Sequence, residues 1–383
     1  MKKILATVLG VLLAATALGS FAACNRGGDR TELNVLNYRV EDKDFYDWFE
    51  EAFEEEYPEI DLVYESVDTA NYSNLLTSRL TGGHVDVFGS QPSMFFTPNV
   101  ESKMYNISDL DIWDGIYDFV LDECTNEGNR YIAPTSVVAG IVFYNKDLFE
   151  DAGLERDVQP ADWDEFIEIC ETLKTYLGVS TEKAPIVTGL LEPWPVNILV
   201  DTVEANAVRG SAPDFFYDLA VGARTMEDPL VTDLMTKISE LAQYFQTAAT
   251  GMQYAMVPGR FATGNYGMMI DGSWQLMQIR ASEPEFEVGT FVLPSNDDPA
   301  KNTNICYKTG GGFSICSDTL HMEEAKKFIE FHMSHDVLQK YADMCMMGTI
   351  SDDFDAGDPL VEEIYNSTEY DYIFPVSYTH LTL

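Results

Sequence analysis

RYIAPTSVVAGIVFYNKDLFEDAGL, residues 130–154, and ADWDEFIEICETLK, residues 161–174, decide the fold of this 383-residue chain. The apolar run 137–144, rich in β-branched residues, has the length of a buried strand. The short helix that follows ends at Gly153, because glycine adopts the left-handed conformation of a helix end without strain. A second helix begins after the N-cap residue Asp162, and its apolar side chains recur at helical spacing. The stretch therefore predicts one buried strand followed by two helices.

The part of the chain before this stretch alternates strands and helices at a spacing that predicts a parallel sheet with crossover helices. In such sheets, ligands bind beyond the carboxyl ends of the strands. Arg39, Ser90 and Gln91 follow the first and third of these strands and are therefore candidate binding residues. The strands are expected at 32–38, 60–64 and 85–88, and the helices at 45–53 and 72–80.

Four stretches, in this order, resemble family 1 extracellular solute-binding proteins, the lipoprotein receptors of sugar ABC importers. The resemblance spans roughly Glu32 to Asp343. It implies an α/β, two-lobed periplasmic-binding-protein fold of type II, in which each lobe is a sheet flanked by helices and the ligand cleft lies between the lobes. The stretches are YSNLLTSRLTGGHVDVF (72–88), the opening stretch with YNKDLF, AGL and WDEF, FATGNYGMMIDGSW (261–274), and GGGFSICSDTLHMEEAKKFIEFHMS (310–334).

The resemblance also implies how the chain divides into lobes. The N-terminal lobe is expected to comprise 32–137 and 306–340, and the C-terminal lobe 138–305 and 341–375. Family members continue for some tens of residues further, so the C-terminal lobe is expected to be incomplete. The tail VSYTHLTL, residues 376–383, resembles translated sequencing-adaptor read-through and is expected to be non-native.

The N-terminus has the pattern of a secretory signal peptide over residues 1–23: a basic start, an apolar core and a mostly small-residue exit. Cys24 follows Ala22 and Ala23 as in a bacterial lipobox, although Phe21 departs from the pattern. We expect Cys24 to carry a lipid anchor and 24–31 to be a tether. The protein would then be exported and held on the outer face of the bacterial cytoplasmic membrane. Ordinary cleavage after Ala22 is the alternative.

Acidic residues outnumber basic ones 64 to 23, which gives a net charge of −41. Such a field repels phosphate, so nucleic acid is not an expected partner, and contact with the membrane is expected through the lipid anchor only. The five cysteines after Cys24 fit no zinc spacing, and the five histidines form no HExxH motif. No metal or cofactor is therefore expected. Cys306 and Cys316 flank a glycine-rich turn and could pair; the alternative is buried free thiols.

The second half of the chain supplies further candidate binding residues. Two prolines bracket Trp194, so neither a helix nor an inner strand suits it, and an aromatic side chain in a fixed loop is a candidate ligand platform. Glu192 and Trp194 resemble the carboxylate-proline-aromatic segment with which maltose-binding proteins contact sugar, and Asn197 follows closely. The resemblance implies that Trp274, in a Gly-Ser-Trp turn, stacks on a sugar ring. Asp271 is either a ligand-binding residue or the cap of the helix after it.

Gly312 belongs to a triplet of glycines in a strand pattern, which suggests a bulge or a close backbone approach. In the family, this region returns to the first lobe beside the ligand. Val138 stands where some maltose-type receptors carry a hinge carboxylate, which argues against maltose specificity.

Together these features predict a non-catalytic, monomeric receptor that closes its lobes on a carbohydrate, an oligosaccharide in particular, and delivers it to an ABC permease. Aromatic side chains would cover the sugar faces, and carboxylates, amides and arginine would pair with hydroxyls. A receptor for another solute such as a polyamine is one alternative. A secreted glycosidase is another, but carboxylate pairs are easy to find among 64 acidic residues and carry little weight.

Overall fold

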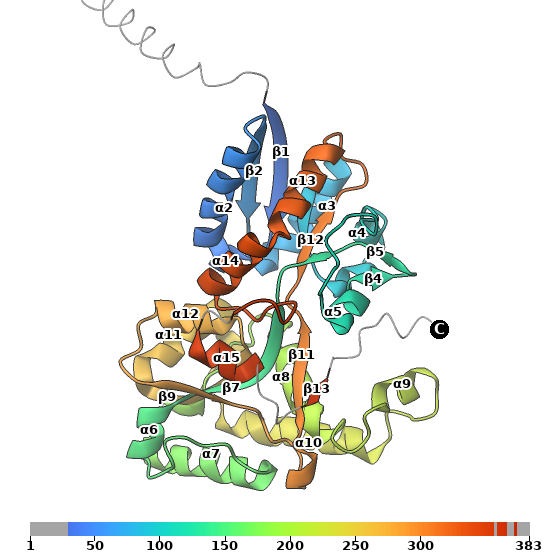
Figure 1. Ribbon diagram of the computed structural model, residues 1–383. Coiled ribbons are helices and arrows are strands. Elements are labelled where there is room, and N and C mark those ends of the chain that lie inside the picture. Colours follow the sequence, from blue (N-terminus) through green and yellow to red (C-terminus); the bar gives the residue numbers. More distant parts are fainter. Residues whose placement is uncertain (1–29, 356–357, 366–370, 374–383) are drawn as a thin grey trace, which may run out of the picture.

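Two separate β-sheets, one above the other in Figure 1, organise the residues that the structure describes, 30–355, 358–365 and 371–373. The structure is a computed structural model. The predicted signal peptide (residues 1–23), Cys24 and the tail 376–383 lie outside the described residues. No helix among the described residues has both the length and the apolar composition needed to cross a membrane.

The first sheet has the strand order β2-β1-β3-β12-β6 and forms the upper lobe (Figure 1). β1 pairs in parallel with β2 and β3, as the alternation of strands and helices predicts, whereas β12 runs antiparallel to β3 and β6. Its strands are β1 (Thr31–Asn37), β2 (Ile60–Ser66), β3 (Val87–Ser90), β6 (Ala133–Pro134) and β12 (Gly312–Ile315). The helices of this lobe are α2 (Lys43–Glu56), α3 (Thr69–Gly82), α4 (Pro98–Glu101), α5 (Asp118–Glu123), α13 (Met322–His332) and α14 (His335–Cys345), and a small ribbon joins β4 (Thr125–Asn126) to β5 (Asn129–Arg130).

The second sheet is built around β7, the buried strand that the sequence predicted at 137–144. β7 pairs antiparallel with β9, β10 and β11, and β8 adds to β9 in parallel. Its strands are β7 (Val137–Asn145), β8 (Ala184–Ile186), β9 (Tyr266–Gly272), β10 (Val288–Phe291), β11 (Asn304–Thr309) and β13 (Asp371–Ile373). The helices of this lobe are α6 (Lys146–Asp151), α7 (Trp163–Leu177), α8 (Pro195–Ala207), α9 (Phe215–Ala220), α10 (Pro229–Leu241), α11 (Val257–Arg260), α12 (Gln275–Ala281) and α15 (Pro359–Tyr365).

The two lobes meet where three chain segments lie side by side and exchange backbone hydrogen bonds. Thr135 N–H donates to the Gly311 carbonyl at 3.0 Å, and Gly310 N–H donates to the Ser136 carbonyl at 2.8 Å. Val137 N–H donates to the Gly348 carbonyl at 3.0 Å. These bonds tie the entrance to β7 to the two segments that cross back, and we call the three segments the hinge (134–137, 309–312 and 346–348).

The hinge lies slightly later in the chain than the resemblance implied. Cys306 belongs to β11 in the second sheet, so the return crossing is at Gly310 and Gly311, not before 306. α14 continues in the first lobe to Cys345, beyond the boundary expected at 341, because Tyr341 donates a hydrogen bond of 2.6 Å to Asp42 of that lobe. Cys306 and Cys316 are both buried and free, so the pairing that the sequence left open is not formed.

The first-lobe core is an aromatic cluster that encloses His332. The imidazole lies within 5.3 Å, centroid to centroid, of Phe49 and within 5.1 Å of Phe313, and its Nε2 is 3.3 Å from the Tyr46 hydroxyl. His332 is buried, and Nδ1 has no hydrogen-bond partner. Burial lowers the pKa of His332 to about 3, so the folded protein keeps this side chain neutral.

Replacing His332 tests this arrangement through the pH dependence of stability. The unfolded state takes up a proton near pH 6.5, whereas the folded state does so only near pH 3, so stability falls as the pH drops between these values. Between pH 7 and pH 5, the wild type should lose about 2 kcal/mol more unfolding free energy than His332→Gln. Urea unfolding at both pH values measures the difference. His84→Gln, at an exposed histidine, is the control and should behave as the wild type. Equal losses in wild type and His332→Gln would contradict the prediction.

Candidate functional site

Tyr254 contacts both Trp194 and Trp274, the two aromatic residues that the sequence predicted for the site. Tyr254 itself was not predicted from the sequence. Its ring meets the ring of Trp194 edge-on, with centroids 4.3 Å apart and planes at 63°. Its hydroxyl accepts a hydrogen bond from the Trp274 indole Nε1 at 2.7 Å and donates one to Asp271 Oδ1 at 2.8 Å. Its backbone N–H donates to Glu192 Oε2 at 3.0 Å. We call these five residues the Tyr254 cluster.

Asp271, at the end of β9, has both carboxylate oxygens engaged inside the second lobe. Besides Tyr254, the backbone N–H of Gly272 donates to Oδ1 at 2.7 Å and the amide of Gln275 to Oδ2 at 3.3 Å. Burial raises the pKa of Asp271 to about 7, and these hydrogen bonds oppose the shift. Asp271 does not cap the helix that follows it. The N-cap position of α12 is occupied by Trp274, and no side chain caps this helix.

The loop before α8 carries Glu192 and Trp194, both partly buried. Trp194 lies in neither a helix nor a strand, as its two flanking prolines predict, and α8 begins directly after it with Pro195 as its first residue. Proline is favoured at this position, since its fixed φ suits the helix and its missing N–H would have had no partner there. Asn197, in the first turn of α8, is exposed.

Trp274 lies over Gly272, and the glycine makes room for the ring. A Cβ atom at 272 would stand 1.9 Å from the indole atom Cζ3, far inside contact distance. Ser273 between them fixes the turn, because its N–H donates to the Ala139 carbonyl at 2.8 Å and its Oγ accepts from the Ala139 N–H at 3.0 Å. The indole is thus held from below by Gly272 and at its nitrogen by Tyr254.

The first lobe presents its candidate residues differently. The guanidinium of Arg39 is buried and bound to Asp42, with Nη2 3.0 Å from Oδ1, and its Nη1 is 3.5 Å from Glu41. Gln91 is exposed at the start of the 3-10 turn η2 (Pro92–Phe96). Ser90, in contrast, lies inside the first sheet, with its Oγ 2.8 Å from that of Ser314.

Gly312 also serves the interior of the first sheet. It pairs with Ser90 on β3 and with Pro134 on β6, and a Cβ there would stand 2.0 Å from the Ala133 carbonyl oxygen. The structure therefore gathers Glu192, Trp194, Asp271 and Trp274 in one cluster but keeps Ser90 and Gly312 within the first sheet.

Two charged residues that act on the Tyr254 cluster, Glu41 and Lys308, were also not predicted from the sequence. Burial raises the pKa of Tyr254 well above its ordinary value, and the negative charges of Asp271 and of Glu41 in the first lobe add to the shift. Glu41 therefore acts on the cluster from the other lobe. In the second lobe, Lys308 Nζ lies 3.4 Å from Asp201 on α8, and the positive charge of Lys308 acts on Asp271. Nothing in the local sequence marks any of these residues.

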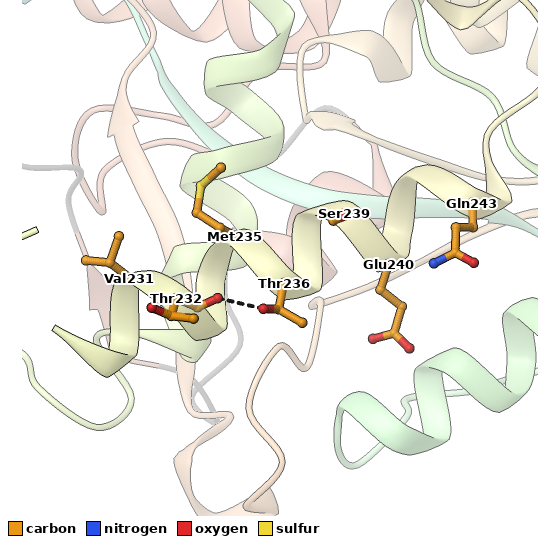
Figure 2. Close-up of a pocket in the computed structure, with 7 residues that line it drawn as sticks. All are labelled: Val231, Thr232, Met235, Thr236, Ser239, Glu240 and Gln243. Atoms are coloured by element: carbon orange, nitrogen blue, oxygen red, sulfur yellow. Dashed lines mark hydrogen bonds between the residues drawn. The ribbon is translucent and has the colours of Figure 1, made fainter. Parts of the chain in front are cut away.

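A surface depression on the outer side of α10 contains none of these residues. It is lined from that helix and from the residue Gln243 just beyond it, by Val231, Thr232, Met235, Thr236, Ser239, Glu240 and Gln243 (Figure 2). Its lining has no aromatic side chain, and we do not assign it a ligand. Within the described part of the chain, no group of three or more histidine, cysteine or acidic side chains is placed to hold a metal ion.

The model of the bacterial extracellular solute-binding protein family matches residues 38–338. A relative named multiple sugar-binding protein, from Streptococcus mutans serotype c, is 26% identical over 347 residues, which cover 84% of this chain and 77% of the relative.

Solved structures share the fold. One, described as SBP RafE in complex with raffinose, has a TM-score of 0.75 at 22% identity, and another, a chitin oligosaccharide binding protein, has a TM-score of 0.77 at 21% identity. Each alignment covers 92% of this chain and 90% of the other. The predicted two-lobed fold is therefore confirmed.

Placing a methyl group beneath Trp274 tests how the indole is held. Gly272→Ala should displace the ring and lower the unfolding free energy by about 1–3 kcal/mol, because added volume in a packed site forces its neighbours to move. Tryptophan emission and urea unfolding of the ligand-free protein measure the two effects. Gly251→Ala is the matched control, since no atom lies within 4 Å of a Cβ there. Identical emission in the two variants would contradict the prediction.

Proposed function

Because the chain belongs to the bacterial extracellular solute-binding protein family, we propose that it captures a carbohydrate, an oligosaccharide in particular, and delivers it to the permease of an ABC importer. The family comprises binding proteins, which agrees with the prediction that the chain is not an enzyme. It is also a family of extracellular proteins, so the chain is exported. Anchoring through a lipid on Cys24, and action as a monomer, are parts of the proposal.

The observation that carries the carbohydrate assignment is the Tyr254 cluster. Sugars have flat apolar faces that pack on aromatic rings, and hydroxyl groups at their edges that pair with polar side chains. Trp194 and Trp274 supply two partly buried indoles from separate segments of one lobe. Arg39, Gln91 and Glu41 lie on the other lobe, so a ligand that touches both sets of residues would favour the closed arrangement by those contacts.

The similar proteins support the same class of ligand. The names of the relative and of the two solved structures refer to multiple sugars, raffinose and chitin oligosaccharides. Their ligands differ from one another, so they support carbohydrate as a class and leave the particular sugar to experiment.

Titration of the exported chain with sugars tests the proposal. The probes are raffinose, maltooligosaccharides, chitin oligosaccharides and, as a cationic alternative, spermidine, with tryptophan emission and calorimetry as readouts. We expect saturable binding of one oligosaccharide and recovery of that sugar intact. Trp274→Ala should weaken binding about tenfold or more, because an aromatic platform and its buried area are lost. Trp48→Ala, at a partly buried tryptophan on α2 of the first lobe, should bind as the wild type.

The outcomes separate the alternatives. Binding of spermidine alone would replace the sugar receptor by a cation receptor, and release of shorter sugars would indicate a hydrolase. No binding of any probe would contradict the proposed function.

The lipid anchor has its own test. In a bacterial host, the full chain should fractionate with membranes and take up labelled palmitate, whereas Cys24→Ser should appear in the soluble exported fraction. Soluble wild-type protein cleaved after Ala22 would contradict anchoring and leave export intact.

A further inference from the structure

Tyr254 is the residue through which the two candidate sugar platforms are connected. It lies in a short irregular segment at the start of the 3-10 turn η5 (Tyr254–Met256), outside the motifs that mark the family resemblance. Its ring packs edge-on against Trp194, and its hydroxyl bridges Trp274 and Asp271. Its four neighbours come from two parts of the chain, 192–194 and 271–274, so Tyr254 joins these two segments.

We propose that Tyr254 is a positioning residue of the ligand site, which fixes Trp274 through its hydroxyl and Trp194 through its ring before a ligand arrives. The proposal rests on the carbohydrate capture proposed above. Asp271 and Glu192 support the same positioning role, because they hold Tyr254 at its hydroxyl and at its backbone N–H. The two tryptophans are then the residues that touch the sugar.

When Asp271 is ionised, the chemistry of the groups gives the hydrogen-bond chain one direction. An indole N–H can only donate, and an ionised carboxylate can only accept. The Trp274 N–H then donates to the Tyr254 oxygen, and the Tyr254 O–H donates to Asp271 Oδ1. The Tyr254 hydroxyl keeps its proton, because burial and the nearby carboxylates raise its pKa well above the ordinary value.

Asp271 is itself fixed, so the chain ends on a rigid acceptor. The Gly272 N–H and the Gln275 amide occupy its oxygens together with Tyr254. With these three donors in place, Asp271 has little accepting capacity left for a sugar hydroxyl. This is why we place Asp271 behind the platforms and not among the groups that contact the ligand.

Fixing the indoles in advance has a direct effect on affinity. A free tryptophan side chain would lose rotamer freedom when a sugar binds, and that loss weakens binding. A side chain already held by a hydrogen bond and by packing loses less. Tyr254→Phe keeps the ring against Trp194 but removes the acceptor for Trp274, so it isolates the hydroxyl bridge.

The experiment compares Tyr254→Phe, Asp271→Ala and Asp271→Asn with a matched control. Tyr244→Phe removes a similar hydrogen bond, from the Tyr244 hydroxyl to Glu171 at 2.7 Å, between other elements of the same lobe. Two readouts are taken: the tryptophan bands of the near-ultraviolet circular dichroism spectrum without ligand, and the affinity for raffinose or a chitin oligosaccharide, whichever the wild type binds.

We expect Tyr254→Phe to reduce the tryptophan bands and to weaken affinity about five- to tenfold, the size of one hydrogen bond. Asp271→Ala should do the same, and Asp271→Asn, which keeps an acceptor oxygen, should restore most of the affinity. The double variant Tyr254→Phe/Asp271→Ala should be no weaker than the weaker single variant, because both remove one connected chain. Tyr244→Phe should leave both readouts unchanged.

Two results would overturn the proposal. One is a Tyr254→Phe protein with the bands and affinity of Tyr244→Phe. The other is a Tyr254→Phe protein with weakened affinity but unchanged bands, which would make the hydroxyl a direct ligand contact. If the wild type binds no sugar, the proposed function fails, while the ligand-free spectra still decide whether Tyr254 positions the indoles.

Discussion

The backbone hydrogen bonds of the hinge are the constraint on which the rest of the structure depends. Three segments distant in sequence meet there, and the bonds from Thr135, Gly310 and Val137 join them edge to edge. The packing leaves no space for a side chain at Gly311, which has φ of +106° and whose Cβ would stand 2.1 Å from the Tyr38 hydroxyl. Two lobes linked in this way can change their relative orientation only through these few residues, so a ligand acts on that orientation through its contacts with both lobes.

Trp274, one of the two proposed sugar platforms, is connected directly to the first residues after the hinge. Ala139 lies on β7, two residues after Val137. Its backbone N–H donates to the Ser273 hydroxyl, and its carbonyl accepts from the Ser273 N–H. Trp274 is the next residue, and Gly272 lies beneath its ring. The turn that carries the platform is thus fixed to the strand that leaves the hinge. Any rotation of the second lobe about the hinge would carry Trp274 with it as part of a rigid unit.

Sequence patterns predicted the elements well, because strands and helices are set by local periodicity and by caps. β7 and α7 appear where the opening stretch placed them, and the Asp162 side chain caps α7 by accepting from Glu165 N–H at 2.9 Å. The site was predicted only in part. Turn residues such as Trp274 can be recognised locally, but Tyr254 acquires its role from partners 17 to 62 residues away. Ser90 was predicted to follow the third strand, but it is the last residue of β3 and its side chain is buried against Ser314 of β12, a contact that depends on the pairing of these two strands.

The large negative charge does not by itself indicate a cationic ligand, because several carboxylates near the hinge are already paired within the protein. Asp42 holds Arg39, Asp201 holds Lys308, and Glu204 lies 3.3 Å from the Arg209 guanidinium. Glu192 and Asp271 are occupied by Tyr254. These five carboxylates bind arginine, lysine and Tyr254 of the same chain. They therefore do not form an open anionic surface for a cationic ligand. A site whose carboxylates accept hydrogen bonds from the protein and whose indoles are partly exposed suits a neutral ligand with apolar faces and many hydroxyl groups, which is the chemistry of a sugar.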